Sequence, residues 1–275
     1  MMRNLYLLII SITIFLLIPA CKKNSSSVEI IETLPPVLTG IHQPIDDDIG
    51  GYYVALPHRY DSTNKRYPVI FFLHGAGQVG QGNATDLPNV LTEGIPKLLN
   101  EQKFPPNFAV GGQNFSFIIL APQFRVLGLN YAVSDLVAFA KNNYRIDTTR
   151  MYIVGFSLGG RLTANYAGDS PYVPAAIVPI SGALTFDITA KCKRIADARL
   201  PVWSFHNVQD EDISVTESMM FVDTINSFKP AIPARITLFP TSNAYLFHDA
   251  WTKATDPGYT EKGINIYQWM LQYKR

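Results

Sequence analysis

Short apolar runs alternate with amphipathic stretches along the chain from about residue 50 onward. The runs are rich in β-branched and aromatic residues and mostly lack strict alternation of polar and apolar positions. This is the pattern of strands that are covered on both faces. They are residues 52–56, 69–73, 117–121, 151–154, 176–180, 202–205 and 235–239.

Helical periodicity fills the intervals between these runs. It is clearest in residues 131–142, where apolar side chains fall at i, i+3, i+4 and i+7 as Val133, Leu136, Val137 and Ala140. Residues 214–228 and 261–273 show similar patterns. Alternating strands and helices predict an α/β fold, with a mostly parallel central sheet and helices on both faces.

Composition and charge restrict the class of protein. The 275 residues are 47% hydrophobic and 16% charged, which excludes disorder for most of the chain. The 23 Lys and Arg nearly balance the 22 Asp and Glu, so no positive excess exists to bind nucleic acid through its phosphates. A single catalytic domain over residues 50–275 is therefore expected.

The N-terminus has the features of a secretory signal peptide over residues 1–20. Arg3 precedes an apolar run over residues 5–18 that is too short to span a bilayer comfortably. Its ending, IPAC at residues 18–21, resembles the lipobox of bacterial lipoproteins, although Pro19 is unusual there. The alternative is that Cys21 merely lies near an ordinary cleavage site.

The lipobox resemblance implies lipidation of Cys21. Residues 21–49 would then be a lipidated N-terminus and polar tether, and the protein would be exported and anchored to a bacterial cell membrane, facing the periplasm or the exterior.

Cys192 would have no disulfide partner. Its neighbours Lys191 and Lys193 could activate the thiol, but the lack of any other catalytic context favours an inert cysteine.

The strongest chemical signal is GFSLG at residues 155–159. It directly follows the predicted strand 151–154 and precedes a sequence that can continue as a helix. A nucleophile elbow needs this order, because the serine adopts a strained conformation at the turn and the glycine two residues away on each side avoids side-chain clashes. Ser157 is therefore the candidate nucleophile.

A glycine-rich turn, HGAG at residues 74–77, follows the predicted strand 69–73. The backbone N–H groups of Ala76 and Leu158 could together form an oxyanion hole, which stabilises developing negative charge. Taken alone, the sequence HGAG would be only a tight turn, and His74 would be structural.

An acid and a base follow the serine in the order that this type of site requires. Asp210 lies just beyond the predicted strand 202–205, and His248 lies beyond the predicted strand 235–239. Three other carboxylates offer alternatives to Asp210, namely Glu211, Asp212 and Asp249. Position favours Asp210 as the acid and His248 as the base.

These segments together resemble the α/β-hydrolase superfamily over residues 50–275. The stretches that carry the resemblance are LHGAG, APQ, IDTTRMYIVGFSLGG, PVWSFHNVQDEDI and HDAW. They are most similar to secreted esterases of the feruloyl esterase, acetylxylan esterase and polyhydroxybutyrate depolymerase type, and more distantly to dienelactone hydrolases. The resemblance implies a triad of Ser157, Asp210 and His248, with Ala76 and Leu158 as oxyanion donors. Asn207, where a glycine is common, departs from the family pattern, as does Ile213-Ser214 in place of Val-Pro.

The sequence thus predicts a serine hydrolase that cleaves carboxylic esters, either small molecules or polysaccharide-linked acyl esters. A peptidase of the prolyl oligopeptidase type is a second hypothesis. A surface lipoprotein that binds glycans or a protein partner without catalysis is a third. No cofactor or metal is expected, because the acidic run at residues 46–48 is better explained as a solvated turn.

Overall fold

A computed structural model describes residues 31–126, 130–240 and 247–275. The predicted signal peptide and the predicted lipidation site, Cys21, lie outside these residues. In the part that is described, no helix is long and apolar enough to cross a membrane.

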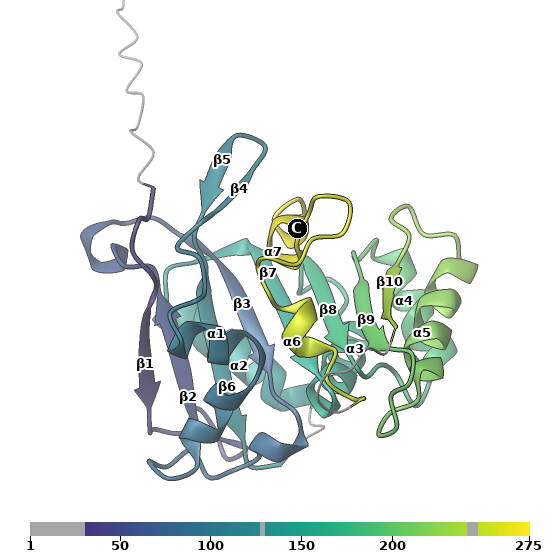
Figure 1. The fold of residues 1–275 in the computed structure, drawn as a ribbon, viewed down its shortest axis with the longest axis horizontal. Coiled ribbons are helices and arrows are strands. Elements are labelled where there is room, and N and C mark those ends of the chain that lie inside the picture. Colours follow the sequence, from purple (N-terminus) through teal and green to yellow (C-terminus); the bar gives the residue numbers. More distant parts are fainter. Residues whose placement is uncertain (1–30, 127–129, 241–246) are drawn as a thin grey trace, which may run out of the picture. The chain divides into compact units, whose positions relative to one another are not determined.

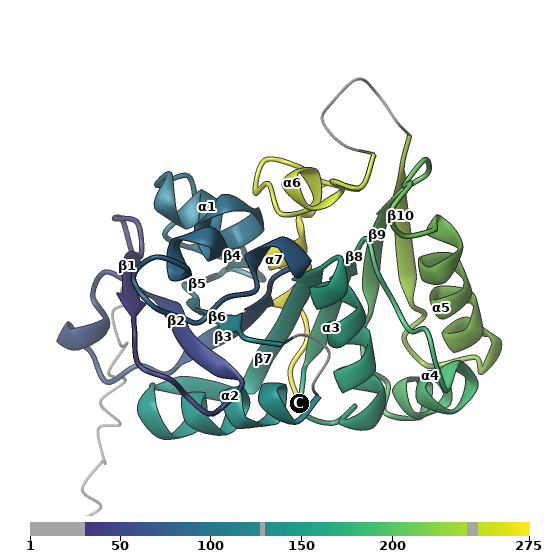
Figure 2. The same cartoon turned by 90° about the horizontal axis from the view of Figure 1, so that it is seen from below.

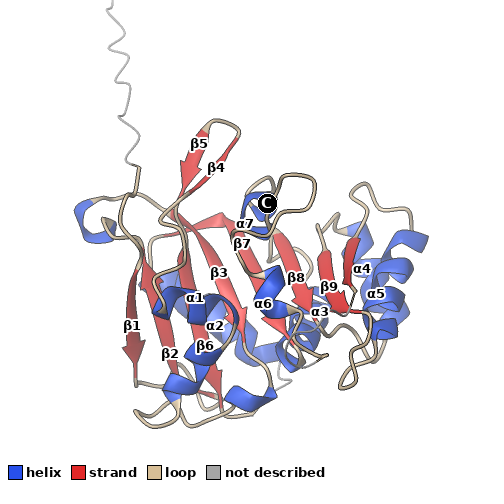
Figure 3. Cartoon of the chain, viewed as in Figure 1, coloured by secondary structure: helices blue, strands red, loops and turns tan. Residues whose placement is uncertain are grey.

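An eight-stranded sheet forms the centre of the fold (Figures 1 and 3). Its strands lie in the order β1-β2-β6-β3-β7-β8-β9-β10. Their bounds are β1 Val37–Ile41, β2 Ile49–Leu56, β3 Tyr67–Leu73, β6 Ile118–Phe124, β7 Ile146–Phe156, β8 Ala176–Ile180, β9 Trp203–Asn207 and β10 Arg235–Phe239. A separate hairpin pairs β4 (Phe108–Val110) with β5 (Gln113–Phe115).

Strands β3 and β6 to β10 run parallel to one another, whereas β2 is antiparallel to both β1 and β6. The mostly parallel sheet is the one predicted from sequence. Strand β1 is a difference, because it pairs with β2 although it lies in the segment predicted to be a tether. Its residues are half-exposed at the sheet edge, so they carry a weaker hydrophobic signal than the central strands.

Helices cover both faces of the sheet (Figure 2). One face carries α2 (Asn130–Asn143), α3 (Leu158–Asp169), α4 (Ile188–Asp197) and α5 (Val215–Ser227). The other carries α1 (Gly94–Asn100), α6 (Trp251–Ala254) and α7 (Ile266–Met270). Short 3₁₀ helices occupy Tyr60–Ser62, Ala76–Gln78 and Leu87–Thr92.

The central strands supply side chains to two separate cores, one on each face. Along β3, Val69, Phe71 and Leu73 pack in the core beneath α2 to α5, whereas Ile70 and Phe72 pack in the opposite one. Successive side chains of a strand point to opposite faces. Because both faces are covered, every position is apolar, which explains the unbroken hydrophobic runs in the sequence.

The predicted C-terminal helix over residues 261–273 is wrong in its extent. Only Ile266–Met270 form a helix, and Asn265 caps it by accepting a hydrogen bond from the backbone N–H of Gln268. Gly263, with φ of +79°, lies in a turn that ends the regular pattern before this helix. The spacing of apolar residues alone did not reveal that the helix begins after Asn265.

Candidate active site

Ser157 occupies the sharp turn between β7 and α3. Its backbone has φ of 54° and ψ of −123°, a conformation that is strained for any residue other than glycine. The Ser157 N–H donates to the carbonyl of Ile180 on the neighbouring strand β8, with N and O 2.9 Å apart. The sheet thus fixes the turn that presents the serine side chain.

The two glycines of GFSLG are required by close packing. A Cβ on Gly155 would lie 2.3 Å from the Gly159 carbonyl oxygen, and a Cβ on Gly159 would lie 2.1 Å from the Leu73 carbonyl oxygen. Both obstacles are backbone atoms, which cannot rotate aside. The backbone of β3, the turn and the first turn of α3 therefore approach one another more closely than any side chain permits.

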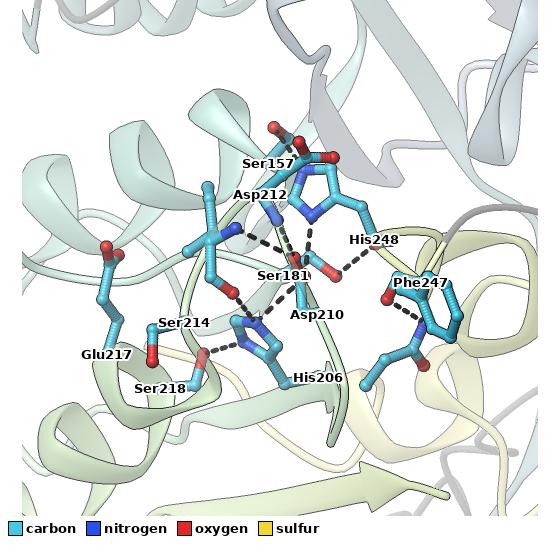
Figure 4. A network of polar contacts seen from close by, with 12 residues as sticks. Ser157, Ser181, His206, Asp210, Asp212, Ser214, Glu217, Ser218, Phe247 and His248 are labelled. Carbon is cyan, nitrogen blue, oxygen red and sulfur yellow. Dashed lines mark hydrogen bonds and ion pairs between the residues drawn. The ribbon is translucent and has the colours of Figure 1, made fainter. Parts of the chain in front are cut away.

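His248 connects Ser157 to Asp210 (Figure 4). Its Nε2 lies 2.9 Å from the Ser157 hydroxyl oxygen, and its Nδ1 lies 2.6 Å from Asp210 Oδ2. In this arrangement Nδ1–H donates to the carboxylate, and Nε2 accepts from the serine hydroxyl. The structure brings the three predicted residues together within hydrogen-bond distance, from segments that are 53 and 38 residues apart in sequence (210 − 157 and 248 − 210).

The segment that carries His248 is held by two neighbouring strand ends. The Ser181 hydroxyl, just beyond β8, donates to the His248 carbonyl at 2.9 Å. The Asn207 side chain, at the end of β9, donates to the Phe247 carbonyl at 3.0 Å. Asn207 is one of the residues that depart from the pattern of the esterases that the sequence resembles, and here its side chain anchors the chain next to the histidine.

The side chain of Asp210 is fully buried. Burial alone would raise the pKa of this carboxyl group. Hydrogen bonds from the rings of His206 and His248 and from the Ile213 N–H outweigh that effect and hold the pKa below its usual range. Asp210 therefore remains ionised at neutral pH.

The alternative carboxylates have other surroundings. Asp249 accepts hydrogen bonds from the N–H and hydroxyl of Thr252, in the first turn of α6. Asp212 is exposed and lines the cavity in front of the serine. Glu211 is also exposed. Among these four neighbouring acids, Asp210 is the one that the structure places against His248.

A cavity of about 450 Å³ opens in front of Ser157 and His248. The predicted oxyanion donors Ala76 and Leu158 both line it. Each is the first residue of a helical turn, where the backbone N–H has no partner within its own helix. Two backbone donors that have no partner in their own helices therefore line the cavity that contains the serine.

His74 is buried just behind this oxyanion turn. Its Nε2 accepts from the Phe124 N–H at 2.9 Å, so its Nδ1 donates to the Gly75 carbonyl at 2.7 Å. Burial lowers the pKa of His74 to about 4, so it is neutral in the physiological range. It has the structural surroundings that the sequence suggested, and it connects the ends of β3 and β6.

Sequence reasoning missed several residues at the cavity. Trp251 packs edge-on against His248, with ring centroids 5.1 Å apart, and its Nε1–H donates to Glu93 at 2.8 Å. Arg161 forms a two-pronged ion pair with Glu217 beside the cavity. Trp251 and Glu93 are 158 residues apart, so no local pattern could have paired them.

Cys192 belongs to α4 and is buried in the core between the sheet and helices α2 to α5. Burial raises the pKa of its thiol to about 12, despite the flanking lysines. A protonated, inaccessible thiol does not react as a nucleophile. Among the residues that are described, no group of three or more His, Cys, Asp or Glu side chains is placed to hold a metal ion.

Comparisons with known proteins give short matches in sequence. An inferred carboxymethylenebutenolidase of Methylorubrum extorquens is 37% identical over 91 residues, which are 30% of this chain and 31% of that protein. A bifunctional acetylxylan esterase/xylanase of Neocallimastix patriciarum is 32% identical over 79 residues, which are 29% of this chain and 11% of that protein. The matches thus span less than a third of either relative, and no protein-family profile matches the chain.

Structural comparison extends over most of the chain. A thermostable esterase superposes with a TM-score of 0.60 and 23% identity, covering 87% of this chain and 63% of that one. The feruloyl esterase module from Clostridium thermocellum, complexed with sinapinate, gives a TM-score of 0.53 and 15% identity, covering 76% and 82%. The α/β-hydrolase fold predicted from the sequence is confirmed.

Proposed function

We propose that this chain, which has the α/β-hydrolase fold, is a carboxylic ester hydrolase that acts through an acyl-enzyme on Ser157. One observation carries the proposal: an unbroken line of hydrogen bonds joins Ser157 and His248, which line an open cavity, to the buried Asp210. A protein that only bound its ligand would need neither the strained serine nor the histidine and carboxylate behind it. Esterases among its structural relatives favour ester hydrolysis over other reactions of this fold.

In the first half of the proposed reaction, the Ser157 oxygen attacks the ester carbonyl while His248 Nε2 takes the serine proton. The imidazolium that forms is stabilised by the Asp210 carboxylate at Nδ1. The carbonyl oxygen becomes an oxyanion, and the N–H groups of Ala76 and Leu158 donate to it. Collapse of this intermediate breaks the bond to the alcohol, which leaves with the proton from His248.

Water completes the cycle. His248, neutral again, takes a proton from a water molecule that attacks the acyl group on Ser157. The second oxyanion collapses, the acid leaves, and the proton returns to the serine oxygen. No cofactor enters either half, because the nucleophile, base and oxyanion donors all belong to the chain.

For the substrate we propose acyl esters of small molecules or of polysaccharides. The cavity combines aromatic walls, Phe156 and Trp251, with polar groups from Gln78, Glu93 and Asp212. Such a lining suits a substrate with both apolar and hydroxylated parts. Two relatives named as an acetylxylan esterase and a feruloyl esterase support this class of substrate.

The test of this function is hydrolysis of nitrophenyl acetate, acetylated xylan and methyl ferulate by the wild type and by Ser157→Ala. We expect the substitution to lower kcat by at least about 10³-fold on every ester that the wild type cleaves, with little change in Tm. Activity within tenfold of the wild type would overturn the proposal. A chain that cleaves peptidyl nitroanilides but no ester would instead support the peptidase hypothesis.

We also propose that Cys21 anchors the exported protein to a membrane, on the resemblance of residues 18–21 to a lipobox. Cys21→Ser should move the protein from the membrane fraction to the soluble fraction without loss of specific activity, because the predicted tether is remote in sequence from the site. Wild-type protein found wholly in the soluble fraction would contradict the anchor.

A further inference from the structure

We infer that His206 is a positioning residue for the proposed reaction: it orients the Asp210 carboxylate from behind, on the side opposite His248. The inference rests on the proposed function. His206 is the penultimate residue of β9, is fully buried, and does not line the cavity. It therefore acts on the chemistry only through the acid.

The contacts of His206 assign its hydrogens. Nε2 lies 3.1 Å from Asp210 Oδ2 and 2.9 Å from the Ile213 carbonyl oxygen. Both neighbours are acceptors, so Nε2 carries the hydrogen and shares it between them. Nδ1 lies 2.8 Å from the Ser218 hydroxyl on α5, which donates to it in the neutral ring. The two acceptors at Nε2 thus fix the tautomer that presents N–H to the acid, and the Ser218 hydroxyl supports it by donating to Nδ1; Figure 4 shows these contacts.

Asp210 is consequently surrounded by donors. Oδ2 accepts from both histidines, and Oδ1 accepts from the backbone N–H groups of Asp212 and Ile213 at 3.0 and 2.9 Å. The two backbone donors fix one oxygen, and the two rings fix the other. Without His206, Oδ2 would be held by His248 alone, which is the ring that Asp210 has to orient.

The other charged groups around this carboxylate are few. Asp212 of the same loop is exposed, and Glu217 of α5 is ion-paired with Arg161 of α3. His206 is therefore the group, besides His248 itself, whose removal most changes how strongly Asp210 attracts a proton on His248. A carboxylate with one donor fewer keeps more of its negative charge facing His248 and stabilises the imidazolium more.

The test compares His206→Phe with His206→Gln, whose side-chain amide can still donate toward Asp210. For His206→Phe we expect kcat to fall by about tenfold to hundredfold with KM little changed. We expect the acid limb of the kcat/KM profile to move to higher pH by roughly half a unit or more. His206→Gln should recover most of kcat and return the profile toward that of the wild type.

Two further variants control for general damage to the core. Ser204 is also fully buried on β9, but its hydroxyl donates to the Pro179 carbonyl, so Ser204→Ala should leave kcat and the pH profile unchanged. Ser218→Ala removes the hydroxyl that holds the His206 ring at Nδ1 and should lower kcat by about threefold to tenfold. If His206→Phe does not fold, the kcat of Ser218→Ala tests the positioning role of His206 instead.

A folded His206→Phe protein with the kcat and pH profile of the wild type would overturn the inference. An equal loss in His206→Phe and His206→Gln without a shift in the profile would also overturn it, since it would indicate only a structural role. These results differ from failure of the proposed function, in which wild type and Ser157→Ala would hydrolyse esters equally.

Discussion

The turn that carries Ser157 and the loop that carries Asp210 are held by different kinds of interaction. The serine turn is fixed by its backbone: a positive φ, two glycines without room for a Cβ, and an N–H bound to β8. The acid is held by two backbone N–H groups of its own loop and, at its other oxygen, by side chains from β9 and from the segment before α6. A turn that is fixed by its backbone requires a short contiguous motif in the sequence. A network of side chains from separate segments leaves no such motif.

The largest expected effect is the loss of kcat when Asp210, in the acid loop, is replaced. Asp210→Asn should lower kcat by up to about 10⁴-fold, because an amide group beside Nδ1 favours the wrong tautomer of His248. Initial rates on nitrophenyl acetate would measure it. Asp212→Asn and Asp249→Asn serve as matched controls and should each stay within about tenfold of the wild type. If Asp212→Asn causes the large loss instead, the assignment of the acid is wrong.

Gly159→Ala tests the steric explanation of the serine turn through protein stability. The new Cβ would lie 2.1 Å from the Leu73 carbonyl oxygen, and relieving that clash moves backbone. We expect a loss of at least about 2 kcal/mol in the free energy of unfolding, measured in urea. Gly77→Ala is the control, since its Cβ would have nothing within 4 Å, and it should lie within about 0.5 kcal/mol of the wild type. Equal stability of the two variants would refute the steric explanation of the turn.

The smallest effect concerns pH. Because the pKa of Asp210 is held below its usual range, the acid stays ionised throughout the range in which histidines ordinarily titrate, about pH 5 to 8. A rise of kcat/KM over this range would therefore report a histidine base and not the acid. In Asp210→Asn the imidazolium loses its carboxylate partner, so the residual rate should rise at a lower pH. A wild-type profile that is flat over this range would count against a histidine base.

The same contrast explains what could be predicted from the sequence. The central strands were predictable because both faces of the sheet are covered, and GFSLG was recognisable because its glycines and serine are contiguous. The order of Asp210 and His248 after the serine followed from the topology of the fold. In contrast, β1, with its half-exposed edge residues, was not distinguished from a tether.

The support around the triad could not be predicted in this way. Ser181 contacts the His248 segment across 67 residues, and the Trp251 contact with Glu93 spans 158. Each contact is made by one hydrogen-bonding side chain that belongs to no periodic pattern in the sequence. His206 stood at a recognisable strand end, but only the fold shows that its ring faces Asp210.

The most direct test of the central claim is to treat the protein with a fluorophosphonate and to locate the adduct by peptide mass spectrometry. A serine activated by His248 and Asp210 should give one adduct, on Ser157, that is absent from Ser157→Ala and forms much more slowly in Asp210→Asn. Labelling of a different serine, or ester hydrolysis that continues without any labelling of Ser157, would contradict the account.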